Sequence, residues 1–270
     1  MKLHICTPMY GGSCCSNYVS SLIGTVAHLN VLGVPSLVTF LDNESLIPRA
    51  RNKLVRAFME GDATHLLFWD GDLGVEVEDL LMMLGEAQDN PEYQIIGAVY
   101  PKKNVNWEAV KAAVLANPAI TVDEMAKVAS DYVVNLPSGE GRITGKSNQL
   151  VEVLEVGTGL MIVAREVFTK VRAAYPELEY MPLDGDFGVA VLDKAAAYQQ
   201  PMFSYFESGV GVAYGEQRCF LSEDFAFCQR WHRMGGKVWM APWVRTTHRG
   251  SFDYRGCLLD AARVQGKGEK

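Results

Sequence analysis

Apolar positions in the first hundred residues follow two alternating spacings. Short apolar runs typical of buried strands lie at 2–8, 35–41, 64–70 and 93–101. Helical spacing of apolar residues occurs between them, at 17–33, 47–61 and 76–87. Gly33 ends the first of these helical segments, and Pro48 lies in the first turn of the second. Strands and helices that alternate through short connections predict a mostly parallel sheet with helices on both faces.

The pattern changes between residues 104 and 149. Two helical segments, at 106–118 and 121–134, are followed there by a polar, glycine-rich stretch. We interpret residues 104–149 as a helical insertion. The second part of the chain then brings a strand, a glycine turn, a strand and a helix at 150–171, an irregular stretch, a helix at 222–236, a strand at 237–243 and a loop with His248. We expect one domain over residues 1–256, made of the parts 1–103, 104–149 and 150–256, and a C-terminal tail over 257–270.

Composition limits the class of protein. The 270 residues are 49% hydrophobic and 21% charged, values typical of one large globular domain. No long uncharged apolar run or signal-peptide pattern is visible, so we expect a cytoplasmic protein without stable membrane insertion. The net charge of −7 argues against nonspecific binding to nucleic acid. The six cysteines form no C-x-x-C pair, which favours reduced thiols over a zinc cluster or a disulfide framework.

The strand expected at residues 64–70 ends in two closely spaced carboxylates, Asp70 and Asp72. Ligands bind at the carboxyl edge of an open α/β sheet, and alternate residues at a strand end can both reach one hard cation. Gly71 between them allows backbone or ligand to approach closely. Taken alone, D-x-D also fits a helix N-cap beside a turn acid, so its meaning depends on the rest of the chain.

Five further motifs accompany this pair in a definite order. They are "TPMY" at 7–10, "IPRARN" at 47–52, "EVGTGLMIVAREVF" at 155–168, "LSEDFAFCQRW" at 221–231 and "THRGSFDYRG" at 247–256. With D-G-D, the series resembles glycosyltransferases of the GT-A fold, above all the small cytoplasmic enzymes of phages and bacteria. A fainter likeness to fungal mannan-polymerase subunits surrounds "RARNKL". The resemblance covers residues 1 to about 100 and 150–256, and it does not extend to 104–149.

The resemblance implies an α/β, Rossmann-like GT-A fold that moves a sugar from a nucleotide-sugar, a UDP- or GDP-sugar, to an acceptor hydroxyl. Residues 1–103 would bind the nucleotide and 150–256 would form the acceptor side. Asp72, helped by Asp70, would hold Mn²⁺ or Mg²⁺ across the diphosphate, with His248 as a third metal ligand or a phosphate contact. Thr7, Pro8 and Tyr10 would contact the base of the donor, and Arg49, Arg51 and Asn52 would reach the nucleotide or its diphosphate. Asp70 would contact the donor through the metal. Gly157, Thr158 and Gly159 would lie near the sugar.

Glu223 and Asp224 open the helix expected at 222–236. By the resemblance, Asp224 is the acceptor-side acid, which in inverting members is the general base, and Glu223 stands beside it. Either acid also suits the positive end of a helix dipole. Asp224 favours inversion and the mannan-polymerase likeness favours retention, so the stereochemical course stays open.

Several alternatives stay open as well. The acceptor could be a glycan, a lipid-linked glycan, a protein side chain or a modified base in DNA. An apolar strand ending in D-x-D also resembles the nucleophile loop of haloacid-dehalogenase-like phosphatases, with Asp70 as nucleophile and Asp72 as acid. That family usually carries the motif on its first strand, whereas here it follows the third. A third interpretation is a GT-A-like module that binds nucleotides without turnover.

Overall fold

The computed structural model describes residues 1–132, 149–182, 201–212 and 218–251. These residues divide between two compact units, of which the first comprises Met1–Lys102 with Tyr132–His248, and the second Lys103–Asp131 with Arg249–Lys270. The glycine-rich stretch expected at 136–149 falls almost wholly outside the described residues, as do the tail expected at 257–270 and most of the irregular stretch before residue 201.

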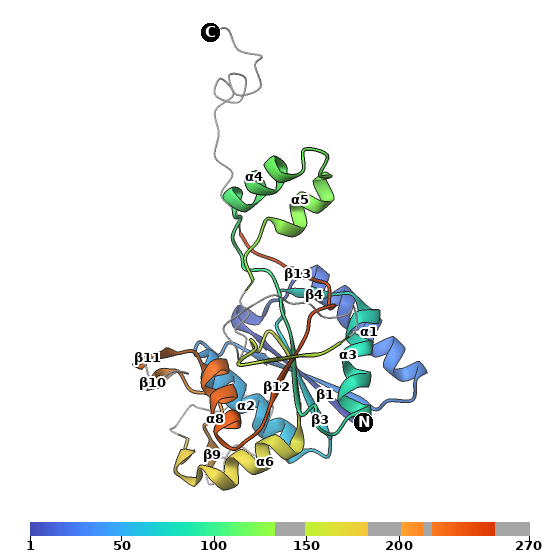
Figure 1. The fold of residues 1–270 in the computed structure, drawn as a ribbon. Helices are drawn as coiled ribbons and strands as arrows, with labels where there is room; N and C mark the ends of the chain where they lie inside the picture. The colour runs from blue at the N-terminus through green and yellow to red at the C-terminus, as the bar shows by residue number, and fades with distance from the viewer. Residues whose placement is uncertain (133–148, 183–200, 213–217, 252–270) are drawn as a thin grey trace. The chain divides into compact units, whose positions relative to one another are not determined.

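The first unit is built on one seven-stranded sheet (Figure 1). Its strands, in spatial order, are β2 (Ser36–Asp42), β1 (Leu3–Met9), β3 (His65–Trp69), β7 (Leu160–Ala164), β5 (Ile95–Ala98), β12 (Val238–Ala241) and β6 (Val151–Val153). Strands β2, β1, β3, β5 and β12 run in one direction, whereas β7 and β6 run against them. The expected class, a mostly parallel α/β sheet flanked by helices, is confirmed.

Helices cover both faces of this sheet (Figure 1). On one face lie α1 (Ser16–Val31) and α3 (Val77–Asp89); on the other lie α2 (Ile47–Glu60), α6 (Arg165–Ala174) and α8 (Glu223–Arg233). Strand β3 shows how the pattern builds two cores, since Leu66 and Phe68 face the α2 side while Leu67 and Trp69 face the α1 side. Both faces of β3 are thus apolar, and polar residues begin where the strand ends.

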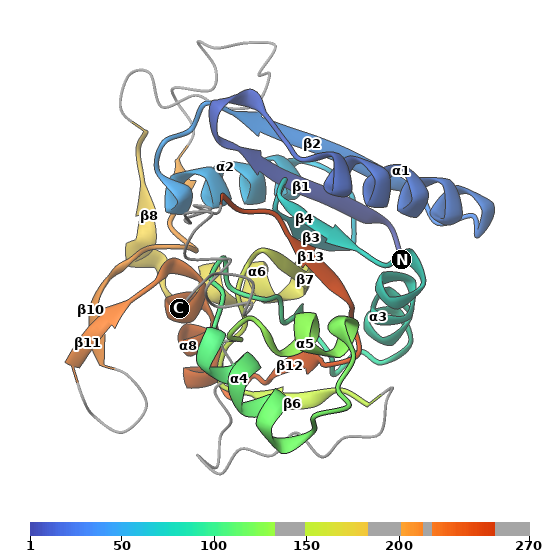
Figure 2. The ribbon, with the colours of Figure 1, turned by 90° about the horizontal axis from the view of Figure 1, so that it is seen from above.

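Three two-stranded sheets complete the first unit (Figure 2). They pair β4 (Leu73–Val75) with β13 (Thr246–His248), β8 (Glu179–Tyr180) with β9 (Met202–Phe203), and β10 (Gly209–Val212) with β11 (Arg218–Leu221). Short 3₁₀ turns cover Tyr10–Gly12 and Pro176–Leu178. The expectation of a loop around His248 was wrong, because this residue ends a strand that pairs with β4.

The second unit contains the two helices expected in the insertion, α4 (Trp107–Ala116) and α5 (Val122–Val128). Asn106 caps α4 by accepting from the backbone N–H of Ala109, and Thr121 with Glu124 forms a capping box at α5. Among the described residues, no helix combines the length and the apolar character needed to cross a bilayer.

Candidate active site

The two predicted carboxylates lie in a tight turn at the carboxyl edge of β3. The Asp70 N–H donates to the carbonyl of Gly159 at 2.8 Å, and the Leu73 N–H closes the turn on the carbonyl of Asp70 at 3.1 Å. Gly71 is close to the start of α1, since a Cβ added there would lie 3.2 Å from the Cβ of Cys14. Any larger residue would push the turn away from α1, so the glycine keeps both carboxylates at the edge of the sheet.

A cleft of about 380 Å³ opens beside this turn. Such a volume suits a small organic ligand. Four residues predicted to bind donor or metal line the cleft: Pro8, Tyr10, Asp70 and Asp72. The other lining residues are Ser13, Cys14, Cys15, Glu44, Ser45, Ile47 and Gly71. Thr7 is fully buried and its hydroxyl shares a hydrogen bond of 2.6 Å with that of Tyr18, so it supports the wall from behind.

Arg51 is a buried cation behind Asp70. Its side chain is 2% exposed, and its Nη2 donates to Asp70 Oδ1 at 2.6 Å. The guanidinium carbon lies 4.9 Å from the centre of the Phe68 ring. Within the part of the chain that the structure describes, its Nε and Nη1 are buried and have no hydrogen-bond partner. Unsatisfied buried donors are costly, so the ion pair with Asp70 is important for keeping this cation inside the fold.

The remaining polar residues of the "IPRARN" motif have protein partners. Glu44, whose side chain is 4% exposed, accepts from Arg49 at 2.6 and 2.7 Å and from Lys53 at 2.6 Å. Burial acts to raise the pKa of Glu44, but the hydrogen bonds from Arg49 and Lys53 outweigh it and lower the pKa to about 2. Asn52 is buried, with both polar atoms of its side chain bonded to the backbone of Phe206 at 2.8 and 2.9 Å. Arg49 is thus tied to Glu44, and Asn52 fixes a neighbouring segment.

His248 comes to Asp72 through the pairing of β13 with β4. The register places His248 opposite Leu73, and its Nε2 lies 3.5 Å from Asp72 Oδ1. The Nδ1 of His248 lies 2.7 Å from the carbonyl oxygen of Pro101. Since a carbonyl only accepts, Nδ1 carries a proton, and in the neutral ring the Nε2 lone pair faces the carboxylate. This is the orientation in which metal-binding histidines are usually held.

The donor set at this edge fits a hard or borderline divalent ion. Carboxylate oxygen and imidazole nitrogen are suitable ligands, and two acceptors facing each other gain from a cation between them. Among the described residues, no cluster of three histidine, cysteine or acidic side chains forms a complete metal site. Asp70 points to Arg51 instead. An ion bound by Asp72 and His248 would therefore need oxygens from a ligand and from water, as is common for Mg²⁺.

The glycine motif Gly157–Gly159 faces Tyr100, which follows β5 at the same edge of the sheet. The Gly159 N–H donates to the Tyr100 hydroxyl at 3.2 Å, and the Tyr100 ring meets the ring of His248 edge to face at 5.3 Å. Thr158 between the glycines is 2% exposed, so it contributes packing. Burial and then the carboxylates of Asp70 and Asp224 raise the pKa of Tyr100.

Asp224 and Glu223 begin α8 on the opposite side of this glycine motif. Asp224 Oδ1 accepts from the Phe225 N–H at 2.9 Å and from the Ser222 hydroxyl. Its Oδ2 lies 3.6 Å from the position that a Cβ on Gly157 would take. Burial and then the Asp224 carboxylate raise the pKa of Glu223, which is half-buried. Of the two acids, Asp224 is the one that geometry directs at the glycine motif.

Among the residues that were not predicted from the sequence, two make polar contacts that shape this site. Tyr100 follows an apolar strand at the same edge as Asp70, and that position was a usable signal. Glu44 lines the cleft and binds two cations of α2. Its role depends on residues five and nine positions later in the chain, and an acid near a helix start does not reveal which cations it will bind.

Comparisons with known proteins give distant structural neighbours. No family model and no curated protein matches the chain. A197 from STIV aligns with a TM-score of 0.48 and 14% identity, over 93% of this chain and 87% of its own. GalNAc-T7, solved with UDP, GalNAc and Mn²⁺, aligns with a TM-score of 0.45 and 11% identity, over 92% of this chain and 44% of its own. The inositol-1-phosphate CTP transferase from T. maritima aligns with a TM-score of 0.41 and 11% identity, over 99% of this chain and 96% of its own. Likeness at this level carries no conclusion about the function of this chain.

Proposed function

We propose that this protein is a metal-dependent glycosyltransferase that moves a sugar from a nucleotide-sugar to an acceptor hydroxyl. The observation that carries the proposal is the pair of Asp72 Oδ1 and His248 Nε2, which lie 3.5 Å apart beside the cleft that Asp70 and Asp72 line. A donor diphosphate would complete the coordination of an ion that two protein ligands hold only in part.

Charge balance in the cleft supports a role for Mn²⁺ or Mg²⁺. Arg49 and Lys53 are bound by Glu44, and Arg51 is bound by Asp70. These three cations of α2 face two carboxylates, and Asp72 supplies a third, so the side chains named here leave no net positive charge for a diphosphate. When bound by Asp72 and His248, the ion would supply a Lewis acid that neutralises charge on the leaving diphosphate.

The residues of the chain then have separate tasks. Tyr10, which is 77% exposed, and Pro8 would pack against the nucleotide base. Arg51, which is paired with Asp70, would contribute positive charge behind the diphosphate. Asp224 would accept the proton of the acceptor hydroxyl as its oxygen bonds to the anomeric carbon. The bond from that carbon to the diphosphate breaks, and the nucleoside diphosphate leaves with the electron pair.

The donor and acceptor follow the expectations from the sequence. A UDP- or GDP-sugar is the expected donor, and the acceptor is a glycan, a lipid-linked glycan, a protein side chain or a modified base in DNA. Asp224 as base corresponds to inversion, which product analysis would distinguish from retention. We also propose a cytoplasmic protein, in keeping with the sequence.

The test is release of nucleoside diphosphate from a panel of nucleotide-sugars, with Mn²⁺ and after chelation. We expect release with one donor class, its loss on chelation and its loss in Asp72→Ala. Asp224→Asn should keep donor affinity within about twofold and lower turnover by at least about a hundredfold, since general-base catalysis contributes about 10²–10⁴. Unchanged turnover in Asp224→Asn would mean that Asp224 is not the general base and that its charge only stabilises the start of α8.

The same assay separates the alternatives. A phosphatase of the haloacid-dehalogenase type would hydrolyse a generic phosphate ester with Mg²⁺ and ignore nucleotide-sugars. The Arg51 contact opposes this role for Asp70, because a carboxylate bound by a buried guanidinium is a poor nucleophile. A binding module without activity would bind the nucleotide and release nothing from any donor.

A further inference from the structure

The packing of the Tyr100 ring does not explain why this residue carries a hydroxyl group. It is half-buried, directly after β5, and its hydroxyl oxygen accepts from the Gly159 N–H at 3.2 Å. That contact uses a lone pair and leaves the phenol proton to be donated elsewhere. Among the described residues, no hydrogen bond takes up this proton.

The two glycines of the 157–159 motif make room for this phenol. A Cβ on Gly157 would lie 2.4 Å from the Tyr100 hydroxyl oxygen, and one on Gly159 would lie 2.6 Å from its Cζ. Neither glycine has a positive φ, so backbone conformation does not require it. The glycines are therefore explained by close approach of a side chain, which is a different reason from a hairpin turn.

The motif also places the phenol between the turn that carries Asp70 and the carboxylate of Asp224. At one end, the carbonyl of Gly159 accepts from the backbone N–H of Asp70 at 2.8 Å. At the other, the Cβ position of Gly157 lies 3.6 Å from Asp224 Oδ2 and 2.4 Å from the phenol oxygen. The phenol is also next to His248, at a ring separation of 5.3 Å. Asp70 and His248 belong to the diphosphate side of the proposed site, and Asp224 belongs to its acceptor side.

In the proposed reaction, the group that lies between the diphosphate side and the acceptor side is the sugar that is transferred. A sugar ring offers several hydroxyl and ring oxygens that can accept a hydrogen bond, and a buried phenol donor without an acceptor gains most from such a partner.

We infer that Tyr100 is a sugar-binding residue, whose hydroxyl donates to an oxygen of the transferred sugar and whose place is set by Gly157 and Gly159. This inference rests on the proposed function and deepens it. It assigns selectivity between donor sugars in part to the end of β5, a position outside the motifs that suggested the function.

The first test compares Tyr100→Phe with wild type in binding of UDP and UDP-glucose, and of GDP and GDP-mannose, in the presence of Mn²⁺. Phenylalanine keeps the ring, its contact with His248 and its place over the glycines. We expect affinity for the free nucleoside diphosphate to stay within about twofold, and affinity for the nucleotide-sugar to fall about tenfold, as loss of one buried hydrogen bond predicts. Tyr93→Phe is the matched control, a half-buried tyrosine whose ring meets that of Trp239 edge to face, and it should change neither affinity.

Two results would overturn the inference. Equal loss of diphosphate and nucleotide-sugar affinity in Tyr100→Phe would mean that the hydroxyl acts on the whole site, and unchanged affinity for both would mean that it contacts no sugar. Wild-type protein that binds no nucleoside diphosphate at all would instead refute the proposed function, and the inference with it.

A second test concerns the glycines. Gly159→Ala should lower the free energy of unfolding in the wild-type background and weaken nucleotide-sugar binding, because the new methyl group displaces the phenol. In a Tyr100→Ala background the same substitution should leave stability nearly unchanged, a non-additivity expected of residues in contact. Equal destabilisation in both backgrounds would show that the backbone requires a glycine at position 159, and that the glycine is not there to make room for Tyr100.

Discussion

At the scale of single residues, Asp70 and Asp72 have different partners although they lie two positions apart. Asp70 takes the buried guanidinium of Arg51, whereas Asp72 faces His248. The difference arises because side chains that flank a tight turn point to separate neighbours. Asp70 therefore acts first as the counter-charge of a buried cation, and Asp72 is the better candidate for a metal ligand.

Removal of the Asp70 carboxylate should lower stability. Asp70→Ala leaves Arg51, which is 1% exposed, without its counter-charge, so we expect the free energy of unfolding to fall by about 2 kcal/mol. Urea denaturation measures it. Asp62→Ala is the control, because Asp62 and its partner Lys2 are both exposed, and no measurable change is expected there. Equal loss in the two variants would contradict the view that burial of Arg51 makes the pair important.

Four of the residues named from the sequence, Pro8, Tyr10, Asp70 and Asp72, line the cleft, and their roles in binding stay predictions. The partners of the buried side chains nearby could not be predicted. The partner of Asn52 is the backbone of Phe206, 154 positions away, and no local pattern carries that information. Tyr100 was missed for a similar reason, since its importance comes from two glycines that lie nearly sixty residues later in the chain.

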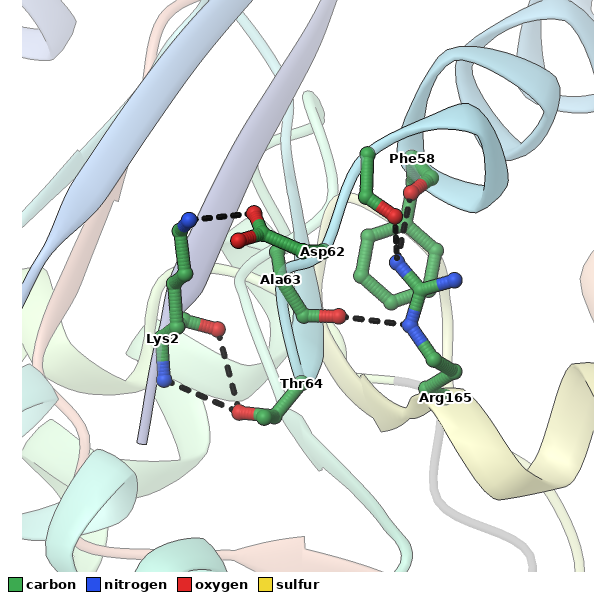
Figure 3. A network of polar contacts seen from close by, with 7 residues as sticks. Lys2, Phe58, Asp62, Ala63, Thr64 and Arg165 are labelled. Atoms are coloured by element: carbon green, nitrogen blue, oxygen red, sulfur yellow. Dashed lines mark hydrogen bonds and ion pairs between the residues drawn. The ribbon is translucent and has the colours of Figure 1, made fainter.

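At the scale of elements, the carboxyl end of α2 is held by one side chain from α6. Figure 3 shows Arg165 beside the Phe58 ring and the end of α2. Its guanidinium donates to the carbonyls of Phe58 at 2.7 Å, Gly61 at 3.0 Å and Ala63 at 2.6 Å, and it lies 4.4 Å from the Phe58 ring centre. A cation that binds the free carbonyls of a helix end stabilises that end.

Arg165→Met should therefore destabilise the protein by about 2–3 kcal/mol, because several carbonyls lose a charged donor together. Equilibrium unfolding in urea gives the change. The matched control is Lys170→Met on the same helix, whose ion pair with Glu166 is exposed at both ends and should matter little. A stability of Arg165→Met equal to that of the control would mean that solvent satisfies this helix end equally well.

Strand β1 contains a second testable feature, the buried His4. It is 2% exposed, and its Nε2 lies 2.7 Å from the Thr39 hydroxyl. Its Nδ1 has no hydrogen-bond partner among the residues that the structure describes. Burial and then the charge of Arg165 lower the pKa of His4 to about 4, from an ordinary value near 6.5. The folded protein thus holds this ring neutral at a pH where the unfolded chain protonates it.

Stability should fall as pH drops from 6.5 towards 4, since the unfolded state then binds the extra proton. Each such histidine contributes a slope of up to about 1.4 kcal/mol per pH unit. His65, with a pKa also lowered to about 4 by burial, contributes in the same direction. His4→Gln should remove about half of the slope, whereas His28→Gln on the exposed side of α1 should leave it unchanged. If the free energy of unfolding of His4→Gln depended on pH as steeply as that of wild type, His4 would not be a source of the slope.

At the scale of the whole molecule, the alternation of strand and helix predicted the class of fold, and the order of motifs led to a candidate site at one edge of the sheet, which stays a prediction. The reversed direction of β7 was not predictable, because a buried apolar strand has the same pattern in either direction. The pairing of β4 with β13 was missed too, since three-residue strands are too short to show a period. That pairing is what brings His248 to Asp72.

The central claim is that Asp72 and His248 hold a divalent ion through which a nucleotide binds. The most direct measurement is a thermal-shift panel of nucleoside diphosphates and nucleotide-sugars, with and without Mn²⁺, on wild type and Asp72→Ala. We predict a Mn²⁺-dependent rise with one nucleotide, of about 2.7 kcal/mol at a hundredfold excess over Kd, and none in Asp72→Ala. A rise that does not depend on Mn²⁺, or one that survives in Asp72→Ala, would contradict the metal site, and no rise with any nucleotide would contradict the proposed function.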